Sequence, residues 1–347
     1  MIKLIDVARR ARVSEATASL ALNNKPGVNS GTRERVRKAA KALGYLPNTV
    51  ARGLATRMTH SIGLVVTDIE NPFFGSATRY LEEFTREEGY HLILSVSLDD
   101  LELEEQIIRD FIGKRVDGVI IIPTIRPRKD LAFLTDLDRH RIPYLFCTSY
   151  YPGAPCECVM CDLEEGSYHL TRYLLALGHR DILLLVTGNR EVIPSRLRIQ
   201  GCLRAFEELG LAFERRRIIQ CDRADFECGY ASTLRVLKKS RPDAVMTIND
   251  IMALGAKRAI KERGYAIPEE ISVAGYDDVI FSSIPEIPLT TVRQNIRQIS
   301  GQAVNLLFKK IRGQPTRRAL HWVKPELVIR QSTGSCPRRS GHEAIRN

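Results

Sequence analysis

The sequence predicts an α/β protein in which a small helical head, residues 1–46, precedes a larger core of two doubly wound α/β lobes, residues 61–334. Three observations indicate this fold. Basic charge concentrates in the first 60 residues, where 12 Lys and Arg outnumber 3 Asp and Glu; the other 287 residues hold 40 against 38. The head shows helical periodicity. The core alternates short apolar runs with helical segments, which is typical of parallel sheets with right-handed crossovers.

Three short helices are predicted in the head. The first spans residues 4–11, and the second follows Ser14, a favourable N-cap. The third begins near Ser30 or Thr32 and ends at Gly44. Two short helices across a three-residue connection suggest a helix-turn-helix unit. The residues expected to face inward are Leu4, Val7, Ala8, Ala11, Ala18, Ala21, Leu22, Val36, Ala39, Ala40 and Leu43.

The head has the charge expected of a surface that meets phosphates, although charge alone is equally typical of a solvated basic face. In a helix-turn-helix unit the second helix presents its first turns to base edges. We therefore expect base contacts from Glu15, Ala16 and Leu20. Polar side chains suited to phosphate contacts are Ser14, Thr17, Ser19, Asn23, Thr32, Tyr45 and Asn48.

An ordered string of motifs carries a resemblance to a known family. DVARRARVSEATASLALNN, then TRERVRKAAKALGYLPNTVARGLA and HSIGLVV, resembles the lactose-repressor (LacI/GalR) family of bacterial transcriptional regulators, and the likeness runs to about residue 334. It implies a helix-turn-helix head, a hinge helix and a core shaped like periplasmic sugar-binding proteins. It also implies a homodimer that binds a pseudo-palindromic operator, repression in preference to activation, and a small-molecule effector. A cytoplasmic location is predicted separately, from the lack of an apolar signal core in the first 20 residues.

The hinge and linker are expected at residues 47–60, with the hinge helix running from Pro47 to Ala55. Proline suits the start of a helix, and so short a helix is unstable alone. In the family, paired hinge helices enter the minor groove and a leucine wedges between base pairs. The resemblance therefore assigns minor-groove contacts to Ala51 and Leu54. The alternative is that Leu54 packs within a linker.

The strand-like runs fall into two series. One includes residues 62–66 and 91–96, and the other includes 181–186, 243–248 and 271–276. A ligand would then lie at the carboxyl ends of these strands. From the resemblance we expect an N-lobe of about residues 61–160 and 291–320 and a C-lobe of about residues 161–290 and 321–334. Residues 335–347 have no apolar period, so we expect a disordered tail there.

Candidate effector-binding residues follow the predicted strands. Arginine forks and carboxylates engage vicinal hydroxyls, while amides both donate and accept. In the resembling family, one arginine contacts the ligand, and Arg198 is the matching position. The predicted set is Asn71, Phe73, Phe74, Arg198, Asn249, Asp277 and Gln294, with Asp250 as a further candidate. Each residue could instead be a cap or a salt-bridge partner. Together they favour a polyol site.

The identity of the effector stays open at this point. A pentose or a similar monosaccharide is favoured, and a nucleoside, a purine or a sugar phosphate is the alternative. Arg126, Arg128 and Arg223 lie in segments expected near the cleft and would add anionic selectivity, but we expect exposed surface arginines at all three.

Other functions are less well supported. The first 20 residues lack the apolar core of an export signal, which disfavours a transport solute-binding protein, and no membrane span is expected. The nucleotide-binding, nucleophile-elbow and metal-helix motifs of enzymes are missing, so we expect a protein without catalytic activity and without a cofactor. Cys156, Cys158 and Cys161 cluster without a convincing fourth ligand, so no metal is expected.

Overall fold

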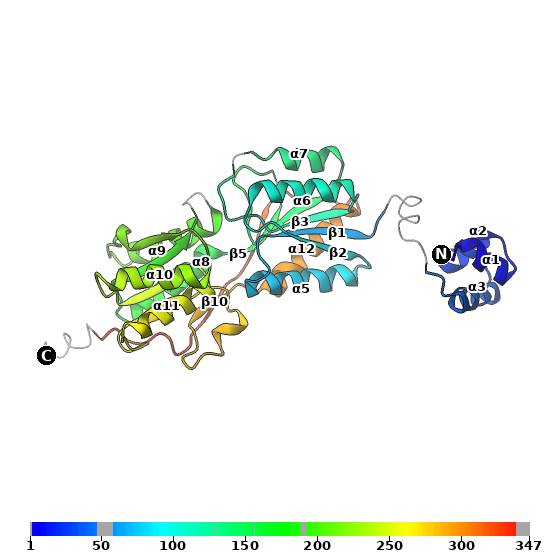
Figure 1. The fold of residues 1–347 in the computed structure, drawn as a ribbon. Coiled ribbons are helices and arrows are strands. Elements are labelled where there is room, and N and C mark those ends of the chain that lie inside the picture. The colour runs from blue at the N-terminus through cyan, green and yellow to red at the C-terminus, as the bar shows by residue number, and fades with distance from the viewer. Residues whose placement is uncertain (1, 47–57, 129, 156, 189–191, 338–347) are drawn as a thin grey trace. The chain divides into compact units, whose positions relative to one another are not determined.

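The computed structural model describes residues 2–46, 58–128, 130–155, 157–188 and 192–337 (Figure 1). The chain divides into two compact units, residues 1–59 and residues 60–347. The combination predicted from sequence, a helix-turn-helix head and an α/β core of parallel sheets, is confirmed.

The first unit contains the three predicted helices, α1 (Leu4–Ala11), α2 (Glu15–Leu22) and α3 (Ser30–Leu43). The Ser14 hydroxyl caps α2 by accepting a hydrogen bond from the Thr17 amide at 3.1 Å. Gly44 ends α3 in the left-handed region, with φ of 63°. The core of this unit consists of small apolar side chains, because short helices must approach closely. Its buried members are Val7, Ala8, Ala11, Ala18, Ala21, Val36, Ala39 and Ala40.

The N-lobe is built on a six-stranded parallel sheet in the order β11-β5-β4-β3-β1-β2. Its central strands are apolar and buried without alternation, as expected for a sheet covered on both faces. Helices α6 and α7 cover one face, and α5 and α12 the other (Figure 1). The elements are β1 (Ser61–Val66), α5 (Pro72–Glu87), β2 (His91–Val96), α6 (Leu101–Gly113), β3 (Gly118–Ile121), α7 (Ala132–Arg139), β4 (Tyr144–Cys147), β5 (Cys158–Cys161), α12 (Ile296–Ile311) and β11 (Leu320–Val323).

The C-lobe is built on a four-stranded parallel sheet in the order β7-β6-β8-β9. Its helices pack in two pairs, α8 with α9 and α10 with α11. The second pair packs closely because Gly229 has no side chain. A Cβ at this position would overlap the Met252 carbonyl group. The elements are α8 (Leu163–Ala176), β6 (Ile182–Thr187), α9 (Ile193–Glu207), β7 (Ile218–Cys221), α10 (Phe226–Leu237), β8 (Ala244–Thr247), α11 (Asp250–Glu262) and β9 (Ser272–Ala274), with 3-10 turns at Arg215–Arg217 and Ile280–Ser282.

Three boundary predictions need correction. Strand β10 (Thr291–Arg293) pairs with β12 (Glu326–Val328) beside the C-lobe helix α8, whereas we assigned residue 291 onward to the N-lobe. Strand β11 pairs with β5 in the N-lobe sheet, although residues 321–323 were assigned to the C-lobe. Both lobe crossings therefore occur a few residues later than predicted. The reason is that strand pairing, which composition does not reveal, decides lobe membership.

The predicted disordered tail also begins too early. Cys336 is buried, and its amide donates a hydrogen bond to the Leu177 carbonyl at 2.8 Å. A single buried cysteine held by a backbone hydrogen bond leaves no periodic pattern in the sequence, so this contact could not be predicted. Residues 338–347 lie outside the described residues.

Candidate functional sites

The start of α2 forms the candidate base-reading surface of the head. Glu15 and Ala16 are exposed, and Thr17, Ser19 and Leu20 are partly exposed. Ala18 and Ala21, on the opposite side of the same helix, are fully buried against α1 and α3. Small alanine side chains on the buried face allow α2 to pack closely against the other two helices. The predicted base-contacting side chains therefore share one accessible surface.

The predicted phosphate-contacting residues in the head have mixed surroundings. The Ser14 and Thr17 hydroxyls are 2.8 Å apart, and the Asn23 amide donates to the Ser19 carbonyl at 2.9 Å. Thr32 is half-buried in the first turn of α3, and Tyr45 packs against the head core. These side chains remain candidates for phosphate contacts. Asn48, Ala51 and Leu54 lie outside the described residues.

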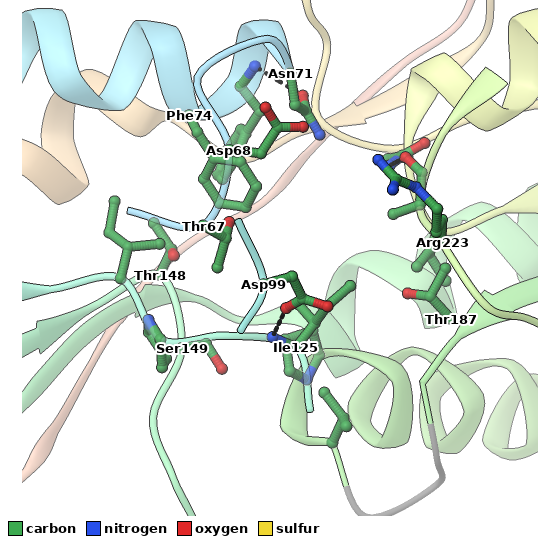
Figure 2. A pocket seen from close by; sticks show the side chains of 18 of the residues that line it. Thr67, Asp68, Asn71, Phe74, Asp99, Ile125, Thr148, Ser149, Thr187 and Arg223 are labelled. Carbon is green, nitrogen blue, oxygen red and sulfur yellow. Dashed lines mark hydrogen bonds between the residues drawn. The ribbon is translucent and has the colours of Figure 1, made fainter. Parts of the chain in front are cut away.

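A cavity of about 610 Å³ lies between the two lobes of the core (Figure 2). All seven residues predicted to bind an effector line it: Asn71, Phe73, Phe74, Arg198, Asn249, Asp277 and Gln294. They meet here because several of them follow the carboxyl ends of parallel strands in the two sheets. The N-lobe residues Asn71 and Phe74 lie on one side of the cavity, and the C-lobe residues Thr187 and Arg223 on the other (Figure 2).

The floor of the cavity is a buried polar cluster from the C-lobe. Arg198 is 5% exposed, and its guanidinium stacks on the Tyr276 ring with 4.1 Å to the centroid. One of its terminal nitrogens lies 3.6 Å from Asp277 Oδ1, which also accepts a 2.5 Å hydrogen bond from the Gln294 amide. Arg198 Nε is buried without a partner among the described residues. The cluster therefore has unused hydrogen-bonding capacity at the cavity.

Burial controls the protonation of this floor. Desolvation raises the pKa of Asp277 from 3.8 to about 8, because the nearby Arg198 charge and the Gln294 hydrogen bond compensate only part of the cost. The backbone there is strained as well, with φ of 108° at Asp277. A carboxyl group held in an unfavourable environment and conformation is common at ligand sites. Asp277 therefore contributes less to the stability of the fold than to a site where a ligand can bind.

The N-lobe wall combines a helix cap with aromatic rings. Asn71 caps α5, since its side-chain oxygen accepts a hydrogen bond from the Phe73 amide at 3.0 Å. The amide NH₂ of Asn71 is left to donate elsewhere. Phe73 is 6% exposed and meets Phe74 edge-on, with ring centroids 5.3 Å apart. Phe74 is half-buried and offers the more accessible ring to a ligand.

Two further candidates in the C-lobe have structural contacts of their own. The Asn249 side chain caps α11 by accepting from the Met252 amide and donates to the Ala224 carbonyl, both at 2.8 Å. Asp250, offered above as a ligand contact, does not line the cavity. It is fully buried and accepts hydrogen bonds from the Val279 amide and the Ser282 and Thr291 hydroxyls. The expectation for Asp250 was wrong because it sits inside α11, one residue beyond the cap.

The three additional arginines differ from one another. Arg126 and Arg223 line the cavity with largely exposed side chains, which pair with Asp99 and Asp225, respectively. Arg128, in contrast, is only 6% exposed and forms ion pairs with Glu104 at 3.0 Å and Glu105 at 2.9 Å. The expectation of an exposed Arg128 was therefore wrong. It was missed because its partners on α6 are distant in sequence.

Sequence reasoning also missed several polar residues of the cavity. Thr67, Thr148 and Thr187 line it at the ends of β1, β4 and β6, next to Asp68 and Ser149. The Thr67 hydroxyl is buried without a hydrogen-bond partner among the described residues. Asp99 follows β2 in a left-handed conformation, accepts a hydrogen bond from the Ile125 amide, and has its pKa raised by burial (Figure 2). A search of every strand end for polar residues would have found these side chains.

Within the part of the chain that the structure describes, no group of three or more His, Cys, Asp and Glu side chains could hold a metal ion. Over the same residues, no helix is both long and apolar enough to cross a bilayer.

Comparisons with known proteins give the family. Residues 3–48 match the bacterial regulatory proteins of the lacI family, and residues 171–333 match the periplasmic binding protein-like domain. The chain is 33% identical over 338 residues to the HTH-type transcriptional repressor PurR of Aliivibrio fischeri (strain MJ11), covering 96% of this chain and 98% of that protein. It is 30% identical over 330 residues to the regulator DegA of Bacillus subtilis (strain 168), covering 95% and 97%.

Solved structures agree. The Lac repressor dimer bound to operator and the anti-inducer ONPF aligns with a TM-score of 0.86 at 28% identity, covering 96% of this chain and 99% of that one. A LacI-family regulator from Enterococcus faecium with bound ribose aligns with a TM-score of 0.70 at 25% identity, covering 79% and 99%. The chain is a DNA-binding transcriptional regulator, and it belongs to the lacI family of bacterial regulatory proteins.

Proposed function

We propose that this regulator is a cytoplasmic repressor that binds a pseudo-palindromic operator as a homodimer, and that a small neutral sugar in the interlobe cavity controls its operator affinity. The sugar assignment rests on one observation: side chains suited to hydroxyl groups, from both lobes, converge on one cavity of about 610 Å³. That volume lies within the usual range for small-molecule sites. The dimeric Lac repressor on its operator and the ribose-bound relative support the proposal.

The charges around the cavity favour a neutral effector over an anionic one. Five acidic side chains line it, namely those of Asp68, Glu70, Asp99, Asp225 and Asp277, against three guanidinium groups. Asp277, whose pKa is raised to about 8, is largely protonated at neutral pH, so the other four carry the negative charge. Arg126 and Arg223 each have a carboxylate partner in their own lobe. A phosphate would therefore meet more negative than positive side chains. The hydroxyl groups of a sugar can donate to the carboxylates and accept from the arginines.

The aromatic wall favours a sugar over a nucleobase. Phe74 is half-buried and lines the cavity, and an aromatic ring suits the apolar side of a sugar ring. A planar base is best held between two aromatic rings, and among the described lining residues the side of the cavity opposite Phe74 carries Arg223 and no aromatic ring (Figure 2). A purine or nucleoside remains the second candidate, because the Arg223 guanidinium is also planar.

A thermal-shift screen of the purified protein tests the effector class. The panel contains neutral sugars, sugar acids, sugar phosphates, nucleosides and purines. We expect a neutral sugar to raise the unfolding temperature of wild type and to have little effect on Arg198→Ala or Asp277→Asn. Arg172→Ala is the matched control, since Arg172 lies on α8 of the same lobe, outside the cavity lining. Stabilisation by purines alone would replace the sugar with the second candidate.

Operator binding tests the regulatory half. DNA fragments that the protein selects from a genomic library serve as the operator. The affinity of the protein for these fragments is measured with and without the stabilising compound. Linkage requires that a ligand which changes operator affinity has its own affinity changed by the same factor, ordinarily about 5- to 150-fold. An inducer lowers operator affinity and a corepressor raises it. Equal operator affinity in both conditions would disprove effector control.

We also propose that the effector leaves the cavity chemically unchanged. The cavity side chains bind and orient hydroxyl groups, and the relatives named above are regulators. Recovery of the unaltered compound after prolonged incubation with the protein would support this proposal, and product formation would contradict it.

A further inference from the structure

Two cysteines flank the loop that forms one wall of the cavity. Cys221 is the last residue of β7, and Cys228 lies in the first turn of α10. Between them lie Arg223, Ala224 and Asp225, which line the cavity. Cys221 is buried and Cys228 is half-buried, and neither is in a disulfide.

The Cys221 thiol lies against the face of α10 that carries Cys228. Cys221 Sγ lies 3.4 Å from the Ser232 hydroxyl, which is one helical turn beyond Cys228 and therefore on the same side of the helix. The Cys228 side chain also interacts with the Cys221 thiol and contributes to raising its pKa. The two cysteines are therefore neighbours across the loop from β7 to α10, an arrangement from which a disulfide could form.

A chain of hydrogen bonds connects Cys228 to the cavity. Its amide donates to Asp225 Oδ1 at 2.9 Å, and Asp225 Oδ2 accepts from Arg223 Nε at 2.8 Å. The intervening Ala224 carbonyl accepts from the Asn249 side chain at 2.8 Å. A displacement of the first turn of α10 would therefore move a cavity guanidinium and the cap of α11.

We propose that Cys221 and Cys228 form a peroxide-sensitive dithiol, and that its oxidation to a disulfide reshapes the wall of the effector cavity. The dithiol itself is independent of the proposed function. Only the effect of the disulfide on effector affinity rests on the proposed function.

The chemistry balances with hydrogen peroxide as the oxidant. The Cys228 thiolate attacks one peroxide oxygen, so that an S–O bond forms, the O–O bond breaks and hydroxide leaves as water. The Cys221 thiol then loses its proton as its sulfur attacks the sulfenic sulfur, an S–S bond forms, and the second oxygen leaves with that proton as water. Two thiols lose two electrons and one peroxide gains them. Cys228 attacks first because it is the more accessible thiol, whereas burial raises the pKa of Cys221 to about 12.

Mass spectrometry of the full chain tests the disulfide. Trypsin cleaves after Arg217, Arg223 and Arg235, so it separates Cys221 and Cys228 onto peptides 218–223 and 224–235. After treatment with stoichiometric peroxide we expect these peptides to be joined, with the loss of two hydrogens, and to separate on addition of a thiol reductant. Cys221→Ser and Cys228→Ser should each abolish the joined species, while Cys202→Ser should leave it intact. Unlinked peptides, or oxygen added to Cys228, would refute the dithiol.

Hydrogen exchange tests the effect on the cavity without any effector. We expect oxidation to change amide exchange at residues 222–228 and also at residues 249–252, beyond the disulfide, and both changes to vanish in Cys228→Ser. A linked pair with exchange altered only at residues 222–228 would refute the coupling to the cavity wall. Because neither readout uses a ligand, failure of the sugar assignment would leave both results interpretable.

Discussion

The head and the core place their charges in opposite environments. Residues 1–60 carry a net charge of +9, and the ion pairs of the head, such as Lys38 with Glu34, are exposed. The core is nearly neutral, with a net charge of +2 over the other 287 residues, yet it buries Arg198, Glu104 and Asp250 and the side chain of Asp277. Exposed charge costs little and acts on a partner over distance, whereas buried charge requires specific partners. Charge should therefore contribute to DNA affinity in the head and to structure and ligand selection in the core.

The largest expected effect of this difference is at Glu104. Its carboxylate is fully buried, accepts hydrogen bonds from Tyr151 and the Thr124 amide, and pairs with the buried Arg128. Glu104→Ala leaves that arginine without its most buried partner, so we expect the free energy of unfolding of the core to fall by about 3–5 kcal/mol. Denaturant unfolding measures this loss. Glu82→Ala is the control, since Glu82 pairs with an arginine on the exposed face of α5; a similar loss there would remove the contrast.

The pH dependence of the core should follow from Asp277. Its pKa is 3.8 when exposed and about 8 in the fold, so between these values the folded state binds a proton that the unfolded state has released. Stability is then highest below pH 4 for this group, and it falls as the pH rises to about 8. The buried Asp250, whose pKa is raised to about 7, acts in the same direction.

Thermal unfolding between pH 5 and pH 8.5 measures this effect, and we expect Asp277→Asn to flatten the decline. The Asn side chain keeps the shape and the Gln294 contact but cannot ionise. If the variant and wild type showed the same pH profile, Asp277 would be ionised in the folded protein and Arg198 would compensate for its burial.

In the head, a helix cap should matter more than any charge. The Asn29 side chain caps α3 by accepting a hydrogen bond from the Thr32 amide at 2.8 Å. Asn29→Ala should reduce the stability of the head by about 1 kcal/mol. Hydrogen exchange of residues 30–43 in the full chain reports on the head separately from the core. Gly31→Ala, next to the cap, tests whether helix propensity alone explains any change.

The smallest effect is expected at the exposed ion pair of α3. Lys38 Nζ and Glu34 Oε1 are 4.0 Å apart, and both side chains are more than half exposed. Glu34→Ala should change the stability of the head by less than about 0.5 kcal/mol. The same exchange experiment measures this change in stability. A loss equal to that of Asn29→Ala would show that exposed ion pairs stabilise the head as much as a helix cap does.

Local signals made the head predictable. The N-cap at Ser14, the left-handed Gly44 and the small residues at helical spacing each act within a few positions of the chain. All three helices were therefore found at their observed positions. The strand order was not predictable in this way, and neither were the lobes of β10 and β11, because pairing joins segments distant in sequence.

The cavity was predicted in part. Asn71, Arg198 and Gln294 were found from their places after strands and from the family resemblance, and they meet in one cavity. Thr67 and Asp99 were missed, although they also follow strands. Asp250 and Arg128 were misjudged because a sequence does not show which of two adjacent carboxamide or acidic residues points inward, or which carboxylates will neutralise an arginine.

The sequence by itself determined the helices of the head, the charge asymmetry, the α/β class and the residue types available to a ligand, since these depend on local periodicity and composition. Only the tertiary structure decided which polar groups lose contact with water. That selection buries the Asp277 side chain beside Arg198, leaves the Thr67 hydroxyl without a partner among the described residues, and brings Cys221 to the face of α10 that carries Cys228. The physical reason is desolvation, whose cost for each group depends on all the segments that surround it in the fold.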